Sequence, residues 1–195
     1  MSETQTTGTL TSYLSFQLGD EMFAADVGKV LEILELCPIT KVPRSPSYMR
    51  GVINLRGKVL PVLDTRIKFG MPATEDNVDT CIVVLDVDMD GESLHLGALV
   101  DSVEEVLELG SADIEPPPSL GSKFNPEYIH GMVKRDENFI MILEVDKVFS
   151  TDELVIAQEV ADKKATEAKA EENKSKDDKK AEKMPVDNKK EKTKS

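Results

Sequence analysis

The feature that most restricts the fold of this chain is a series of short apolar runs, each soon ended by turn-forming residues. The clearest example is residues 51–66, which read G-V-I-N-L-R-G-K-V-L-P-V-L-D-T-R. Runs of branched apolar residues suit buried or half-buried strands. Between the two runs lies Arg56-Gly57-Lys58, where Gly57 can adopt the positive φ that a tight turn often requires. The segment therefore predicts a β-hairpin with two cations at its tip.

Strand-like runs of the same kind recur along the chain and surround further turn sequences. They are residues 13–18 with 22–25, 80–87 with 94–100, and 128–133 with 139–143. Many short strands with repeated turns predict a mostly β protein built as small barrels or as a sandwich. Residues 128–143 also loosely repeat the pattern of 51–63, which favours two similar subdomains.

Helices are expected at only two places. Residues 26–36 have apolar side chains at helical spacing after Asp26, a plausible N-cap, and so predict a short helix that runs into a strand at 33–36. The apolar residues within 145–149 and 154–160 predict a closing amphipathic helix.

Composition divides the chain into three parts. Residues 1–11 are rich in Thr and Ser and predict a flexible lead-in. Residues 12–160 carry the apolar runs and predict the folded domain, with the boundary between its two subdomains near 70–80. From residue 161 to 195 the chain is dominated by Lys, Glu, Asp, Ala, Asn and Ser. Such a segment buries too little surface to offset its ordering entropy, so a disordered charged tail is expected.

The charge distribution restricts the class of partner. The 195 residues include 24 basic and 37 acidic side chains, for a formal net charge of -13, which argues against a general affinity for nucleic acid or anionic lipid. Residues 38–69 nevertheless hold seven cations and one acid, whereas residues 70–122 contain no Lys or Arg. Two oppositely charged segments suit two different protein surfaces, or they pair with each other inside the protein.

The cysteines and the hydropathy pattern indicate a compartment. Cys37 and Cys81 stand apart, without a CxxC motif or a signal peptide, and so read as reduced cysteines of a cytoplasmic protein. No apolar run approaches the roughly 20 residues of a membrane span, so no direct membrane insertion is expected.

The sequence lacks the usual signatures of catalysis. It contains no P-loop, no G-x-G-x-x-G and no nucleophile elbow, and neither His95 nor His130 has a carboxylate or cysteine at ligand spacing. We therefore expect a binding protein without enzymatic activity or cofactor. Residues 86–92, D-V-D-M-D-G-E, match the opening of a calcium-binding EF-hand loop, but position twelve is Gly97 instead of Glu and both flanks are strand-like. An acidic hairpin turn is the preferred interpretation, with a calcium-binding β protein as the alternative.

Several motifs taken together resemble the CheW family of chemotaxis adaptors, from about Tyr13 to about Leu154. They are L-G-D-E at 18–21, V-L-E-I at 30–33, G-V-I-N-L-R-G at 51–57 continuing to Leu63-Asp64, D-S-V-E-E-V-L at 101–107 and I-E-P-P-P at 114–118. The resemblance implies two five-stranded SH3-like β-barrels packed around a shared core. It also implies a non-enzymatic adaptor that couples methyl-accepting chemoreceptors to the histidine kinase CheA, and that is cytoplasmic but recruited to membrane receptor arrays by its partners.

The resemblance also implies roles for single residues, carried over by motif position. A receptor-binding groove between the barrels would be formed at or near Val30, Glu32, Arg56, Cys81, Val103 and Val106. Leu120 would contact the regulatory domain of CheA. An apolar cleft with a few charges suits the tip of an amphipathic helical hairpin. Residues 88–93 lengthen one hairpin relative to the family pattern. The alternative function is a CheW-like scaffold of another receptor–kinase pathway, similar to CheV without its receiver.

Overall fold

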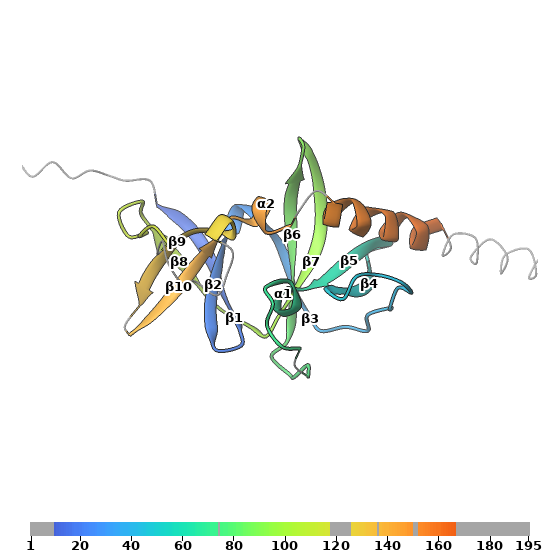
Figure 1. Ribbon diagram of the computed structural model, residues 1–195, viewed down its shortest axis with the longest axis horizontal. Helices are drawn as coiled ribbons and strands as arrows, with labels where there is room; N and C mark the ends of the chain where they lie inside the picture. The colour runs from blue at the N-terminus through green and yellow to red at the C-terminus, as the bar shows by residue number, and fades with distance from the viewer. Residues whose placement is uncertain (1–9, 74, 118–125, 136, 150–151, 167–195) are drawn as a thin grey trace, which may run out of the picture.

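The protein, seen here as a computed structural model, is built on two five-stranded sheets (Figure 1). The structure describes residues 10–73, 75–117, 126–135, 137–149 and 152–166. Sheet A has the order β8-β1-β2-β10-β9, and sheet B has the order β3-β6-β7-β5-β4. The predicted mostly β architecture is confirmed. Each sheet, with the short helix that follows its hairpin, is called subdomain A or subdomain B below.

The bounds of the elements are as follows. Sheet A contains β1 (Thr11–Leu18), β2 (Glu21–Asp26), β8 (Ser102–Leu109), β9 (Ile129–Arg135) and β10 (Asn138–Leu143). Sheet B contains β3 (Val30–Glu35), β4 (Met49–Leu55), β5 (Lys58–Asp64), β6 (Cys81–Met89) and β7 (Glu92–Val100). The helices are η1 (Val27–Lys29), α1 (Thr65–Lys68), η2 (Pro126–Tyr128), α2 (Val145–Val148) and a further helix over residues 152–166.

The two subdomains do not follow one another along the chain. Sheet B runs without interruption from β3 to β7, whereas sheet A is assembled from β1 and β2 and from β8 to β10. The expected boundary near 70–80 is therefore wrong, because these residues connect β5 to β6 within sheet B. Their polar composition resembles that of a linker, but they form a surface loop of one subdomain. The true crossings lie between β2 and β3 and between β7 and β8.

The helix expected within residues 26–36 is also largely absent. Asp26 does cap a helix, since its side chain accepts a hydrogen bond from the Gly28 backbone N–H at 2.8 Å, but this helix is only η1. From Val30 the backbone pairs with β6 instead, in a register that runs from Val30 opposite Leu85 to Glu35 opposite Cys81. This pairing with a neighbouring strand overrides the helical spacing of the apolar residues in the segment.

The ends of the chain differ slightly from expectation. Thr11, assigned to the lead-in, already belongs to β1. The closing helix forms after α2 as expected, and Leu154 and Ala157 on it are buried, but it continues to residue 166, past the expected end at 160. The other residues of the predicted lead-in and tail, 1–9 and 167–195, lie outside the described part of the chain.

Buried side chains form one core inside each subdomain and a larger core between them. Strand β6 shows why: Ile82 and Val84 point into the core of subdomain B, while Cys81, Val83 and Leu85 point to the shared core. In β10, likewise, Ile142 lies in the core of subdomain A and Met141 in the shared core. Because side chains alternate between the faces of a strand, strands buried on both faces read as continuous apolar runs.

The hairpin and helix that close each subdomain are repeats of one another. β4 and β9, and α1 and α2, are related by a constant offset of 80 residues, from 49 to 129 and from 65 to 145. Tyr48 and Tyr128 fill the same role, since their carbonyl oxygens accept the backbone N–H of Asp64 at 2.7 Å and of Glu144 at 2.9 Å. The loose repeat seen in the sequence is therefore a structural one.

A matching pair of glycines explains how each of these hairpins is covered at its edge. Short bridges join Thr40 to Val52 and Glu115 to Met132, beside Gly51 and Gly131. A Cβ atom at either glycine would lie under 3.0 Å from the backbone oxygen of the covering segment. Both glycines thus permit a close backbone approach that blocks the outer edges of β4 and β9.

Candidate partner-binding surface

The tip of the β4–β5 hairpin holds an arginine in a defined orientation. Arg56 and Gly57 have φ values of 52° and 84°, and positive φ at both central positions is the pattern of a type I′ turn. The Asn54 side-chain oxygen accepts the Gly57 backbone N–H at 2.8 Å, which fixes the turn. Arg56 Nη2 then donates to Glu32 Oε2 at 2.7 Å.

This ion pair connects the two sides of subdomain B. Glu32 lies on β3, at one edge of sheet B, and Arg56 follows β4, at the other edge. The Arg56 side chain is 79% exposed and that of Glu32 is 23% exposed, and ion pairs this exposed contribute about 0–1 kcal/mol to stability. The guanidinium therefore adds little to the fold and remains accessible to a partner.

Apolar side chains are exposed on the same edge strand as Glu32. Leu31 and Ile33 on β3 are 46% and 45% exposed, and Val106 on β8 is 54% exposed. Because side chains alternate along a strand, Leu31 and Ile33 lie on the face of β3 opposite to Glu32. Strands β3 and β8 are edge strands of sheets B and A. Leu31 and Ile33 were not singled out from the sequence. The alternation of exposed and less exposed positions along residues 30–34 is typical of a strand, but the helical spacing of the apolar residues in this segment predicted a helix.

Three of the expected site residues lie beneath the surface. Val30 and Val103 are partly buried against the shared core, and Cys81 is buried within it. Burial raises the pKa of the Cys81 thiol, while a hydrogen bond with the Val103 backbone acts in the opposite direction. The structure thus brings Cys81 next to Val103 and Glu32 next to Arg56, with Val106 on the outer face of β8. Leu120 lies outside the described residues.

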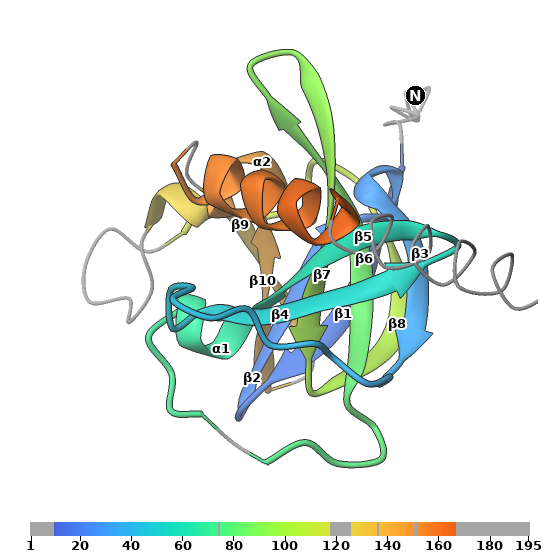
Figure 2. The same cartoon turned by 90° about the vertical axis from the view of Figure 1, so that its right-hand side faces the viewer.

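The acidic segment 86–92 forms the protruding β6–β7 hairpin (Figures 1 and 2). Strands flank it on both sides, where an EF-hand would have helices. Asp88 Oδ1 accepts the Gly91 backbone N–H at 3.0 Å, and Asp86 accepts the Ser93 hydroxyl, so both carboxylates stabilise the hairpin. Within the described ranges, no three His, Cys, Asp or Glu side chains are grouped as a metal site would require.

In the same ranges, none of the helices has the length and apolar character needed to cross a membrane.

Comparison with known proteins identifies the family. A family model described as a CheW-like domain matches residues 12–153. The chain is 36% identical over 140 residues to the chemotaxis protein CheW of Rhizobium meliloti (strain 1021), covering 72% of this chain and 88% of the relative. It is 31% identical over 149 residues to the chemotaxis protein CheW of Klebsiella aerogenes, covering 76% and 87%.

A solved structure agrees with these sequence matches. The crystal structure of the scaffolding protein TtCheW from Thermoanaerobacter tengcongensis aligns with a TM-score of 0.65 and 29% identity, covering 77% of this chain and 94% of that chain. The architecture and the sequence thus lead to the same assignment, and the chain belongs to the CheW family.

Proposed function

We propose that this chain is a non-enzymatic, cytoplasmic adaptor that couples methyl-accepting chemoreceptors to the histidine kinase CheA. Membership of the CheW family supports a scaffolding role in chemotaxis, because the chain spans most of the length of relatives that carry this name. The receptor tip and the regulatory domain of CheA are the partners proposed here. No nucleic acid and no inserted membrane segment enter the proposal.

The observations that support the proposal most directly are the exposed guanidinium of Arg56, paired with Glu32, and the exposed Leu31 and Ile33 on the same edge strand as Glu32. A partner helix that packs along the edge of β3 could contact Leu31 and Ile33 with its apolar side and exchange hydrogen bonds with Arg56. Apolar anchors surrounded by charges are typical of such interfaces. Val106 would extend the apolar contact onto β8.

The remaining site residues take supporting roles in this proposal. Val30, Cys81 and Val103 lie against the shared core, so they would hold the two edge strands in position instead of contacting the receptor over a large area. The kinase contact is assigned to Leu120 on the strength of the family motif alone.

The experiment that tests the receptor surface compares two charge reversals. Arg56→Glu removes the exposed guanidinium and places a second carboxylate next to Glu32, so we expect receptor-dependent kinase activation in a reconstituted array to fall about tenfold or more. Arg135→Glu is the matched control, because Arg135 pairs with Glu105 at 3.2 Å in subdomain A. We expect this variant to activate normally. Both variants should unfold within about 1 kcal/mol of the parent.

Normal activation by Arg56→Glu, or an equal loss in both variants, would contradict the assignment of the receptor surface. Binding to a receptor cytoplasmic fragment and to CheA, measured separately, tests the adaptor role itself. Failure to bind the receptor fragment refutes it, whereas binding to the receptor but not to CheA would favour a scaffold of another receptor–kinase pathway.

A further inference from the structure

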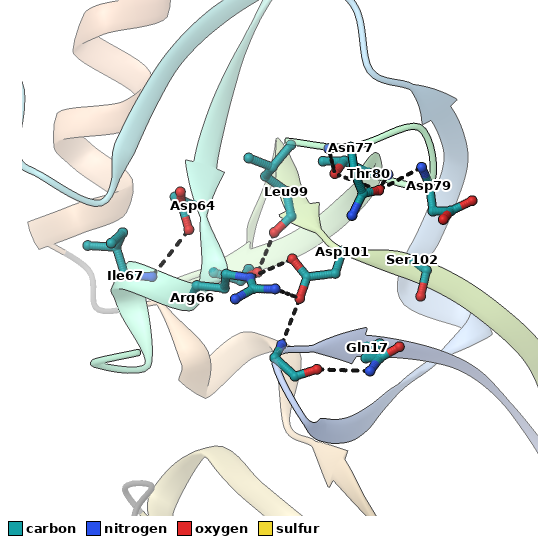
Figure 3. A network of polar contacts seen from close by, with 12 residues as sticks. Gln17, Asp64, Arg66, Ile67, Asn77, Asp79, Thr80, Leu99, Asp101 and Ser102 are labelled. Atoms are coloured by element: carbon teal, nitrogen blue, oxygen red, sulfur yellow. Dashed lines mark hydrogen bonds and ion pairs between the residues drawn. The ribbon is translucent and has the colours of Figure 1, made fainter. Parts of the chain in front are cut away.

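An ion pair holds the crossing from subdomain B to subdomain A (Figure 3). Asp101 is the single residue between β7 and β8. Arg66, on α1 of subdomain B, binds its carboxylate side-on through Nε and Nη2. From subdomain A, the backbone N–H of Gly19 donates to the same carboxylate at 2.6 Å, and the carbonyl of Gln17 accepts the Asp101 N–H at 3.0 Å. One carboxylate is thus bonded from both subdomains.

A second ion pair holds the other crossing. Lys29 lies in η1, which connects β2 of subdomain A to β3 of subdomain B. Its ammonium group donates to Asp146 Oδ1 at 2.9 Å, and Asp146 lies on α2 of subdomain A. The same carboxylate oxygen accepts the backbone N–H of Asp88 in β6, at 2.9 Å. Asp146 therefore also joins one crossing segment to both subdomains.

The two ion pairs occupy equivalent places in the repeat but have opposite polarity. Arg66 and Asp146 are both the second residue of their helices and are separated by the same offset of 80 residues. Their partners, Asp101 and Lys29, lie in the crossings that follow β7 and β2, which are the third strands of the two sheet orders. In each subdomain the helix thus pairs with a crossing, but α1 supplies the cation of its pair and α2 supplies the anion.

Both crossings lead directly into the strands that bear the candidate receptor surface. Lys29 precedes Val30, the first residue of β3, and Asp101 precedes Ser102, the first residue of β8. Hydrophobic attraction in the shared core brings the two subdomains together but has no preferred direction of its own. Charge-assisted hydrogen bonds are directional, above all in the bidentate Arg66–Asp101 pair.

We infer that Arg66–Asp101 and Lys29–Asp146 are positioning pairs, which set β3 and β8 relative to one another and so assemble the receptor surface from two subdomains. That this surface receives the chemoreceptor rests on the proposed function. The side chains of Arg66 and Asp101 are 15% and 19% exposed, and those of Lys29 and Asp146 are 34% and 30% exposed. The less exposed pair is screened less by solvent, so Arg66–Asp101 has the larger effect.

The test replaces one cation at a time and measures the distance between the subdomains. Arg66→Met and Lys29→Met remove the charge and keep an apolar stem of similar length. Arg135→Met is the matched control, because its ion pair with Glu105 lies within subdomain A. Spin labels at Lys58→Cys in β5 and Glu108→Cys in β8, in a Cys37→Ser background, report the distance by pulsed electron paramagnetic resonance. Cys81 is buried with a raised pKa and should remain unlabelled.

We expect the distance distribution to shift or broaden most in Arg66→Met, less in Lys29→Met and not in Arg135→Met. Without labels, the affinity for a receptor cytoplasmic fragment should fall in the same order, about threefold or more for Arg66→Met. Unchanged distances in both Met variants would overturn the inference, and so would changed distances with unchanged affinity.

The distances are measured without receptor, so this result stands apart from the proposed function. If the parent protein fails to bind the receptor fragment, the proposed function is wrong while the distances still decide whether the pairs position the subdomains. If Arg66→Met does not fold, Asp101→Asn replaces it, because the Asn side chain still offers an acceptor to the Gly19 N–H.

Discussion

Subdomain A and subdomain B each carry an ion pair between an edge strand and the hairpin at the opposite side of the sheet. In subdomain B, Arg56 pairs with Glu32 of β3 at 2.7 Å, and in subdomain A, Arg135 pairs with Glu105 of β8 at 3.2 Å. Strands β3 and β8 hold the same place in the two sheet orders, as do the hairpins β4–β5 and β9–β10. An ion pair of this kind therefore belongs to the fold and is not by itself a sign of function.

The neighbours of the two glutamates are what differ. Along β3, Glu32 is preceded and followed by Leu31 and Ile33, which are nearly half exposed on the opposite face of the strand, whereas along β8 Glu105 lies between Glu104 and Val106. Two exposed apolar side chains on one edge strand suit a partner surface, while β8 offers Val106 alone among exposed carboxylates. The comparison thus supports placing the proposed receptor surface in subdomain B, on a backbone that both subdomains share.

The largest expected effect tests whether the two subdomains are one folding unit. Phe23 is fully buried and stacks on Phe16 of subdomain A at 6.2 Å and on Phe69, next to α1 of subdomain B, at 5.3 Å between ring centroids. Phe23→Ala should lower the free energy of unfolding by about 3–5 kcal/mol, because it opens a cavity in the shared core.

Urea denaturation followed by circular dichroism and by tyrosine fluorescence checks this prediction. Since both subdomains lose packing together, the two probes should report one common transition. Phe139→Ala is the control, because Phe139 is nearly half exposed on β10, and it should change stability by about 0.5 kcal/mol or less. Two separate transitions in the Phe23→Ala variant would show that the subdomains unfold independently and that the shared core couples them weakly.

A smaller effect should separate the two equivalent glycines. Gly51 has φ of +149°, and a Cβ there would lie 2.3 Å from the Thr40 carbonyl oxygen. At Gly131 the nearest atoms would be Ile114 Cγ2 at 2.3 Å and the Glu115 carbonyl oxygen at 2.9 Å. Gly51→Ala should lower the free energy of unfolding by about 1–3 kcal/mol more than Gly131→Ala does, because strain of the backbone conformation adds to the close contact. If thermal denaturation shows that both variants lose the same stability, the segments that cover the two glycines adjust equally, and the positive φ of Gly51 adds little strain.

The hairpins of this fold could be predicted from the sequence, because strands buried on both faces produce long apolar runs and because Gly57 marks the turn. The topology could not be predicted in the same way. The pairings of β2 with β10 and of β5 with β7 are parallel and join distant segments, and no local pattern encodes them. Surface loops are generally polar, so the polar composition of residues 70–80 does not distinguish a loop within one subdomain from a linker between two.

The residues of the candidate site likewise divide into those that the sequence could indicate and those that only the structure revealed. The family resemblance led to Arg56 and Glu32, which the structure brings together, whereas the roles of Leu31 and Ile33 depended on recognising β3 as a strand. Arg66, Asp101, Lys29 and Asp146 carried no signal as pairs, because each pair joins residues from different subdomains. The constant offset of 80 residues was present in the sequence, and a closer comparison of 48–69 with 128–149 would have aligned Arg66 with Asp146.

The smallest expected effect uses the fact that one positioning pair contains lysine and the other arginine. The hydrogen bond to Asp146, aided by the charges of Asp146, Asp86 and Asp88 and opposed by burial, raises the pKa of Lys29 above its ordinary value of 10.5. A raised pKa in the folded state means that this stabilisation is fully present below 10.5 and is lost as pH rises through the higher folded value. Arginine, unlike lysine, is effectively always protonated in proteins, so the pair that contains Arg66 lacks this pH dependence.

The difference in unfolding free energy between the parent and Lys29→Met should therefore stay constant up to about pH 10 and shrink toward zero above it. Its size near neutrality should be below about 1 kcal/mol, because about a third of each side chain is exposed to screening solvent. The difference between the parent and Arg66→Met should persist over the same range. Urea titrations at about pH 8 and pH 11.5 distinguish the two pairs. If both differences fade together, general charge repulsion at high pH dominates, and the Lys29–Asp146 pair has no separate role in holding its crossing.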